Sequence, residues 1–428
     1  MKKFFLLTLT FLVISGSLLS AQPYMEKKSQ HRFAQSYVGL NAQVTPSSGL
    51  MFWDGETHAF PLMTSPRISI GGLHFWGKVD FNLNIPLTTF ADFKLDDETD
   101  FEFNPGGDLS ARYYPWRSQF NKLRPYAGFS FNEMIFSLKN ENAGTRRDLF
   151  ITTSVLAGLA FASNGWQINA ELMWLPNNKR TFYPDRMSPE TFELPKSYFS
   201  VGLIRYFEGT LREEADLESG RMQRLVERFR KEGKLNSFSL AAAPSGSYFM
   251  LAPPLNDPMR RSLPRHKGTF VWDYGLGYLF HDAGLHIGVS YRDYTSAVES
   301  YGFEHLIRRR SLALEGFKFL GDYNGFVPFI GPSISLESWA TGEFEEDIQQ
   351  GKTIRKQMIS PGIIFGWDIL ASPLETWVLR TNLRYYPFQK IKGTDGKTTR
   401  VDQFEFNFIQ LVIYPNRLFN YPKVKGRI

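Results

Sequence analysis

The stretch from residue 123 to residue 136 alternates apolar residues with small or polar ones at a period of two. Ala127, Phe129 and Phe131 fall on one face, whereas Gly128 and Ser130 fall on the other. This period predicts a β-strand with one apolar face and disfavours an amphipathic helix. The predicted strand therefore separates an apolar environment from a more polar one.

The same alternation returns in the second half of the chain, in residues 327–336. Two other segments repeat as well: 166–176 aligns without a gap on 377–387, and 151–158 aligns on 359–366. Such repetition predicts that an eight-strand unit is duplicated. Chance similarity between two alternating patterns is the other interpretation.

Segments with the length of a transmembrane strand recur along the whole chain. In the first half we expect strands near 36–45, 67–76, 78–86, 109–116, 124–137, 149–161, 166–175 and 197–207. In the second half we expect them near 236–250, 269–280, 283–294, 311–319, 327–339, 357–369, 376–386 and 403–414.

The connections between these strands alternate in length. Short turns such as 163–165 and 281–284 contrast with long polar connections such as 87–108 and 177–196. Short turns at one end and long loops at the other are typical of outer-membrane β-barrels. The predicted fold class is therefore all-β, a transmembrane antiparallel barrel of about 16 strands built from two 8-strand repeats. Two tandem 8-stranded barrels are the alternative.

The ends and the middle of the chain define the expected domains. Residues 1–21 have two lysines, an apolar core and a small-residue end, which is typical of a cleaved signal peptide. Residues 22–208 and 236–428 hold the two repeats, and the second includes a short C-terminal tail. The charged segment 209–235 between them contains a predicted periplasmic helix at 211–232, interpreted as a linker or as a plug.

Each half resembles the small eight-stranded outer-membrane barrels, the family that contains the OmpA transmembrane domain and OmpW-like proteins. The resemblance rests on 112–116 and 123–129, and on the Phe329-Ile-Gly331 strand of the second half. In this family the final strand is read by the barrel-assembly machinery, which implies a role for Phe404 to Tyr414 here. The end of the signal, Leu19-Ser-Ala-Gln22, resembles signals common in Bacteroidetes, a Gram-negative group.

Residues opposite the apolar stripe are expected to face the lumen. Charged candidates of both signs follow from this alternation: Asp80, Arg112, Glu171, Asp273, Glu315, Arg380 and Arg384. They predict either a weakly selective channel or a structural network of paired charges. In a single closed barrel, Arg112 and Glu315 would lie on opposite walls. Tryptophans and tyrosines at strand ends, including Trp76, Trp166, Trp367 and Tyr386, are interpreted as interfacial girdles.

The leading functional hypothesis is a porin-like passive channel for small polar solutes. The alternative is a non-conducting structural or adhesion barrel that presents extracellular loops. No catalytic motif, metal-ligand spacing or cofactor site is recognised, so an enzyme is not expected. The acidic stretches 96–102 and 343–347 are interpreted as solvated outward loops.

The chain contains no cysteine, which excludes lipidation of the lipoprotein type and disulfide chemistry. Cleavage of the signal removes Lys2 and Lys3, which lowers the formal charge from +6 to +4. This positive excess is too small to indicate nucleic-acid binding. Expected partners are outer-membrane lipid and lipopolysaccharide, together with the assembly machinery during insertion. Self-association into a homo-oligomer is left open. The expected location is the cell outer membrane.

Overall fold

The computed structural model describes most of the chain beyond its N-terminal segment. The described residues are 32–53, 56–87, 91–95, 97–119, 121–140, 144–183, 189–207, 220–249, 262–264, 266–392 and 398–420. The predicted signal peptide lies outside the described residues, as do the first part of the charged segment and the end of the C-terminal tail. Among the described residues, no helix is long and apolar enough to cross a membrane.

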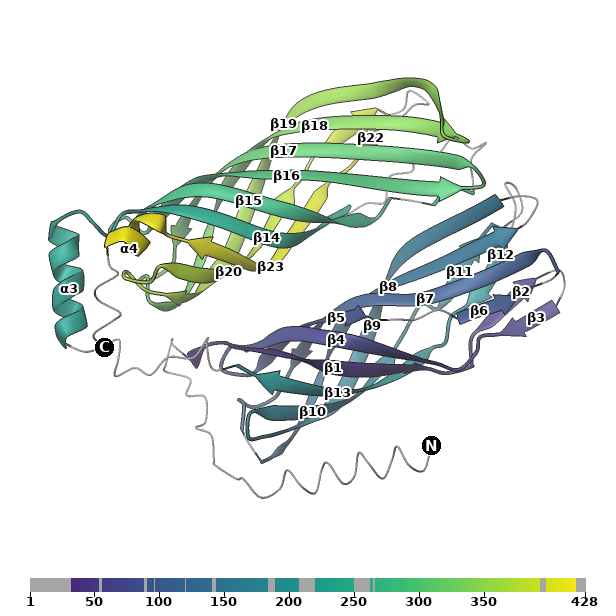
Figure 1. Cartoon of the computed structure of the whole chain (residues 1–428), viewed down its shortest axis with the longest axis horizontal. Helices are drawn as coiled ribbons and strands as arrows, with labels where there is room; N and C mark the ends of the chain where they lie inside the picture. The colour runs from purple at the N-terminus through teal and green to yellow at the C-terminus, as the bar shows by residue number, and fades with distance from the viewer. Residues whose placement is uncertain are drawn as a thin grey trace.

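The first half forms a closed antiparallel barrel (Figure 1). Its eight wall strands are β1 (Gln35–Thr45), β4 (Met63–His74), β5 (Val79–Pro86), β7 (Thr99–Tyr113), β8 (Leu123–Asn140), β9 (Gly144–Ser163), β10 (Trp166–Trp174) and β13 (Ser197–Tyr206). Each strand pairs with the next in this order, and β13 pairs with β1, Tyr206 lying opposite Tyr37. The ring is thus closed within the first half.

The second half repeats this arrangement. Its eight wall strands are β14 (Ser237–Phe249), β15 (Gly268–Phe280), β16 (Leu285–Ser300), β17 (Phe303–Phe319), β18 (Gly325–Glu345), β19 (Ile348–Ala371), β20 (Trp377–Tyr386) and β23 (Gln403–Ile413). Consecutive strands pair, and β23 closes the ring on β14 through the Leu240–Ile413 register. Both halves therefore use the same order of connections.

The prediction of an all-β antiparallel barrel is confirmed, but the preferred version, one closed barrel of about sixteen strands, is wrong. The alternative, two tandem eight-stranded barrels, is what the strand pairing forms. A single large barrel would require β13 to pair with β14 and β23 to pair with β1. Instead, the first and last strands of each half pair with each other, so neither half has a free sheet edge.

Each predicted strand coincides with an observed one, and the main differences lie at the long-loop end. There β17 begins at Phe303 and β19 at Ile348, well before the expected 311 and 357. The acidic cluster 343–347 therefore belongs to a hairpin, because Glu345 pairs with Ile348 across a two-residue turn. Both turn residues, Glu346 and Asp347, have positive φ, as a type I′ turn requires.

Short elements surround the long-loop ends of the barrels. The first barrel carries a small sheet of β2 (Leu50–Trp53), β3 (Glu56–Ala59), β11 (Lys179–Phe182) and β12 (Glu190–Glu193), and β6 (Ala91–Lys94) extends beside β7. The second carries the hairpin of β21 (Lys390–Lys392) and β22 (Thr398–Arg400). An aromatic cluster seals the first barrel at this end, with Phe60, Phe101, Phe136 and Phe192 all buried.

Two helices lie at the short-turn end of the second barrel (Figure 1). The predicted charged helix is observed as α3 (Gly220–Lys231), and α4 (Pro415–Asn420) follows the last strand. Phe229 of α3 is buried against Leu235 and Leu374, so part of the apolar stripe of the helix contacts the barrel rim. This position, on the side of the short turns, is the one expected from the even number of preceding strands.

The two barrels lie side by side (Figure 1). Near the short turns, Phe33 stacks on Phe326 with ring centroids 3.5 Å apart, and Phe81 faces Trp367 at 6.3 Å. At the opposite end, the tip of β16 pairs with the start of β9. Trp367, interpreted from the sequence as part of an interfacial girdle, therefore contributes to the contact between the barrels.

Candidate functional site

The interior of the first barrel holds an ion-paired triad on three strands. Asp80 of β5, Arg112 of β7 and Glu171 of β10 are at most 3% exposed. Arg112 Nε donates to Glu171 at 2.7 Å, and Arg112 Nη1 donates to Asp80 at 3.2 Å. The Tyr37 hydroxyl donates to the other Asp80 oxygen at 2.6 Å. A guanidinium with two carboxylates crosses the lumen between β7 and β10.

A second layer lies toward the long-loop end of the same barrel. Arg67 Nη1 donates to Asp108 at 2.5 Å, and the Asn84 amide donates to the second Asp108 oxygen at 2.9 Å. Ser69 donates to the Asn84 carbonyl at 2.5 Å. All four side chains are buried. This layer continues the polar filling above the triad.

Near the short turns, Arg124 closes the interior of the first barrel. Its guanidinium donates to the Gly77 carbonyl at 3.1 Å and to the Gln167 side-chain carbonyl at 3.2 Å. The same group lies over the Tyr114 ring, 4.1 Å from its centroid. Arg124 is fully buried, so buried polar side chains occupy the interior from the Arg67 layer, through the triad, to the short turns.

The second barrel contains a larger network. Arg384 of β20 donates to Glu315 at 2.5 Å and to Asp273 at 2.7 Å. Arg292 of β16 lies 3.2 Å from Glu405 and 3.6 Å from Glu315. Each carboxylate thus contacts at least one guanidinium, and none of these side chains is more than 8% exposed.

Two further ion pairs extend this network along the axis of the second barrel. Toward the long loops, Arg309 donates two hydrogen bonds to Glu337, at 2.6 and 2.8 Å. Toward the short turns, Arg380 donates two to Asp368, at 2.6 and 2.9 Å. Bidentate pairs of this kind fix both partners in one geometry.

The central triads of the two barrels occupy corresponding strands and have opposite signs. In the first barrel an arginine on β7 faces a glutamate on β10. In the second, Glu315 on β17 faces Arg384 on β20. The third member is also reversed, since Asp80 on β5 corresponds to Arg292 on β16. The signs of these three residues are therefore reversed strand by strand, although the register differs: Asp80 lies opposite Arg112, whereas Arg292 lies opposite Ser311.

The structure places all seven predicted lumen-facing residues in the barrel interiors, where they are at most 6% exposed. It does not bring Arg112 and Glu315 onto opposite walls of one lumen, because they belong to different barrels. Tyr386 also departs from expectation. Its side chain points inward, and its hydroxyl accepts a hydrogen bond from Arg292 at 3.0 Å. Because side chains alternate along β20, Tyr385 faces outward and the next residue, Tyr386, faces inward.

Several interior residues were absent from the sequence-based set. Arg124 lies two residues before the inward Tyr126, so the period of β8 contained its signal. Arg309 shares the parity of Glu315, but the predicted strand began too late to include it. Arg67 stands at the inward parity of Ser69 on β4. Period two identifies Arg67 and Arg124 within the predicted strands, and it identifies Arg309 once the strand is extended to its observed start.

Little open space is left beside the network of the second barrel. A cavity of about 20 Å³ lies there, next to Ser239 and His286. Ser239 Oγ and His286 Nε2 are 2.9 Å apart. This serine–histidine pair was not predicted from the sequence. The cavity is about the size of one water molecule, so it cannot admit a substrate.

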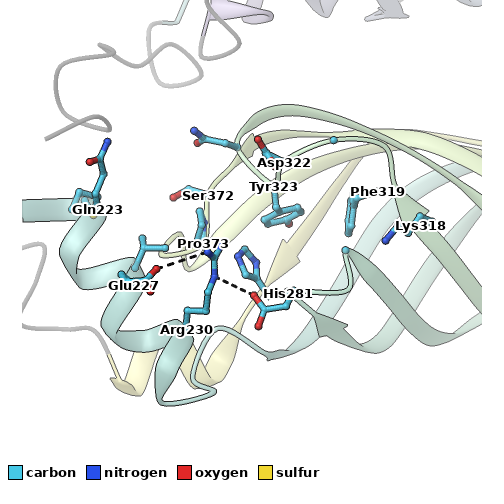
Figure 2. Close-up of a pocket in the computed structure, with 16 residues that line it drawn as sticks. Gln223, Glu227, Arg230, His281, Lys318, Phe319, Asp322, Tyr323, Ser372 and Pro373 are labelled. Atoms are coloured by element: carbon cyan, nitrogen blue, oxygen red, sulfur yellow. Dashed lines mark ion pairs between the residues drawn. The ribbon is translucent and has the colours of Figure 1, made fainter. Parts of the chain in front are cut away.

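A larger cavity of about 940 Å³ lies between α3 and the short turns of the second barrel (Figure 2). Arg230 of α3 contacts Asp282 at 3.2 Å and Glu227 at 3.8 Å at its edge. Burial, reinforced by Arg417, lowers the pKa of His281 to about 4, so this imidazole is neutral at pH 7. The described residues contain no group of three or more His, Asp or Glu side chains able to hold a metal ion.

No protein-family model matches the chain, and no curated protein matches it. Among solved structures, Neisserial surface protein A is 14% identical, with a TM-score of 0.29, covering 42% of this chain and 97% of that one. The N-terminal barrel domain of Pseudomonas aeruginosa OprF is 13% identical, with a TM-score of 0.24, covering 42% and 99%. Each of these matches covers a share of this chain comparable to one half, and each half forms its own closed eight-stranded ring.

A longer similarity spans both halves. An outer membrane channel from Pseudomonas putida F1 is 7% identical, with a TM-score of 0.20, and the match covers 93% of this chain and 98% of that one. At this level the similarity carries no argument about activity. The barrel interiors themselves are the basis for a functional conclusion.

Proposed function

We propose that this chain is an integral outer-membrane protein whose two filled barrels do not conduct, and that it acts as a structural or adhesive scaffold at the cell surface. This proposal favours the second of the two functional hypotheses over the porin-like channel. The observation that carries it is the ion-paired filling of both interiors.

The membrane location is supported by a belt of exposed apolar side chains. On β15 alone, Phe270, Trp272, Tyr274 and Leu276 are each more than half exposed. Exposure of this apolar surface to water would be unfavourable in free energy, and monomeric soluble proteins rarely expose large contiguous apolar patches. Alternation of apolar outward and polar inward residues is the pattern of a lipid-embedded barrel.

The absence of conduction is supported by barrel size and by charge pairing. An eight-stranded barrel has an interior just wide enough for its own side chains. Here those side chains are large, and they are held by contacts from opposite walls, such as Arg112 with Glu171. Opening a pore would separate these buried ion pairs. Breaking a buried ion pair typically costs roughly 3–5 kcal/mol for each charge left without a partner.

A surface role is supported by the regular structure that continues beyond the apolar belt. The hairpin of β18 and β19 pairs without interruption from Ser338 to Thr341 and then across a short irregularity to Glu345. In the first barrel the aromatic cluster around Phe101 and Phe192 seals the same end. Paired strands and a packed cluster hold a fixed surface toward the outside.

Planar bilayers test this proposal. The purified chain, refolded in detergent and shown to be folded by its gel mobility before and after heating, is added to a bilayer beside a known porin. We expect silent bilayers from this chain at protein concentrations at which the porin conducts. Steady, reproducible conductance steps from the folded chain would overturn the proposal and restore the porin-like hypothesis.

A further inference from the structure

Three outward-facing arginines lie together on the second barrel, on the strands β17 and β19. The side chains of Arg308 and Arg310 are 46% and 53% exposed, whereas Arg309 between them points into the barrel. Arg355 of β19 is also exposed. No part of the interior network uses these three side chains.

Their height on the barrel follows from the apolar belt. Leu312, Leu336 and Ile359 are outward apolar residues on β17, β18 and β19, with exposures of 49, 51 and 72%. On β17 the next outward residue toward the long loops is Arg310, followed by Arg308 and then Leu306. The arginines therefore interrupt the outward apolar surface near the long-loop end of the strands, where we place the lipid head groups.

The register of the strands forms a shallow trough between the arginines. Arg308 pairs with Ala340, and Ala340 pairs with Arg355, so the two arginines flank a small residue in one row. In the adjacent row Ser338 lies beside Arg310. Neighbouring strands are about 4.8 Å apart, so the backbones of Arg308 and Arg355 are roughly 10 Å apart across a floor of small side chains.

The trough has an excess of positive charge. Asp293 of β16 contacts Arg308 at 2.8 Å and Arg310 at 3.1 Å, so one carboxylate serves two guanidiniums. Arg355 has no ion pair among the described residues. Three guanidiniums and one carboxylate leave a local formal charge of +2. A planar guanidinium pairs with phosphate oxygens in a bidentate manner, which favours a phosphate ligand.

We infer that this trough binds the phosphate group of an outer-leaflet glycolipid, as found in the lipid A part of lipopolysaccharide. The inference rests on the proposed membrane location, because the trough adjoins the lipid surface and so meets a phosphate tethered to acyl chains. The first barrel lacks this feature. On β7 the outward residues toward the long loops, beyond the irregularity between Pro105 and Asp108, are Asn104 and Glu102, and neither is basic.

Lipid titration of the full-length chain tests the inference. The wild-type protein and the triple variant Arg308→Ser/Arg310→Ser/Arg355→Ser are compared in detergent by native mass spectrometry. The probes are bisphosphorylated lipid A, the same lipid without its phosphates, and inorganic phosphate. Lys139→Ser is the matched control, because Lys139 is an exposed cation on the first barrel with a single carboxylate partner, Glu102, at 3.1 Å.

We expect wild type and Lys139→Ser to bind bisphosphorylated lipid A at least tenfold more tightly than its dephosphorylated form. The triple variant should lose this preference while keeping the wild-type urea midpoint, since all three side chains are exposed. Equal binding by wild type and triple variant would overturn the inference. Displacement of the lipid by millimolar inorganic phosphate would also overturn it, because the site would then serve a soluble anion. Bilayer conductance is independent of these outcomes, so failure here leaves the proposal of a non-conducting barrel standing.

Discussion

Replacing Arg112 by methionine tests the filled interior most directly. The guanidinium compensates both Glu171 and Asp80, and methionine fills similar space without charge. Removing one partner of a buried ion pair typically costs about 3–5 kcal/mol. Because two carboxylates lose their cation here, we expect the upper end of this range. Domains of ordinary stability unfold with about 5–15 kcal/mol, so the loss would be a large fraction of the total.

The matched control is the triple variant Arg112→Met/Asp80→Asn/Glu171→Gln, which removes all three charges together. Without uncompensated charges it should stay within about 2 kcal/mol of wild type, since neutral replacement of a buried ion pair is often tolerated. Urea unfolding in detergent micelles, followed by tryptophan fluorescence, measures both variants. If the single and triple variants have the same unfolding free energy, the carboxylates are solvated and the interior is a hydrated lumen.

Two other predictions address the barrel wall and the long-loop end. Gly331→Val should prevent folding of the second barrel, because a Cβ there would overlap the Gly316 carbonyl, whereas Gly316→Ala should fold normally; heat-modifiable gel mobility distinguishes them. Burial, and to a lesser degree His305, lower the pKa of His266 to about 3 from an ordinary value of 6.5. Between pH 6.5 and about 3, His266 is therefore protonated in the unfolded chain and neutral in the folded chain. The free energy of unfolding consequently falls as the pH drops through this range. At pH 4.5 we expect His266 alone to contribute a loss of roughly 2–3 kcal/mol relative to pH 7. His266→Gln should therefore lose less stability than wild type by about this amount, while His281, whose pKa is also lowered, keeps its own contribution. A pH dependence identical to that of wild type would contradict the assignment.

Much of the fold could be predicted from the alternation of residues. The period of two located the wall strands and assigned their faces, because a strand turns successive side chains to opposite sides regardless of its neighbours. Asp80, Arg112, Glu171 and Arg384 were assigned inward for this reason, and each is buried. The same rule accounts for Arg124 within the predicted strand, and for Arg309 once β17 is extended to its observed length.

What the sequence by itself determined is thus the number and the sidedness of the strands. Which edges meet was decided only by the tertiary structure, where β13 returns to β1 and β23 returns to β14. One large barrel and two small ones place the same residues inward and outward, so the pattern cannot distinguish them. The distinction matters because two small rings bring opposite walls within reach of each other. At that distance Arg112 meets Glu171, and Arg384 meets Glu315, instead of lining water.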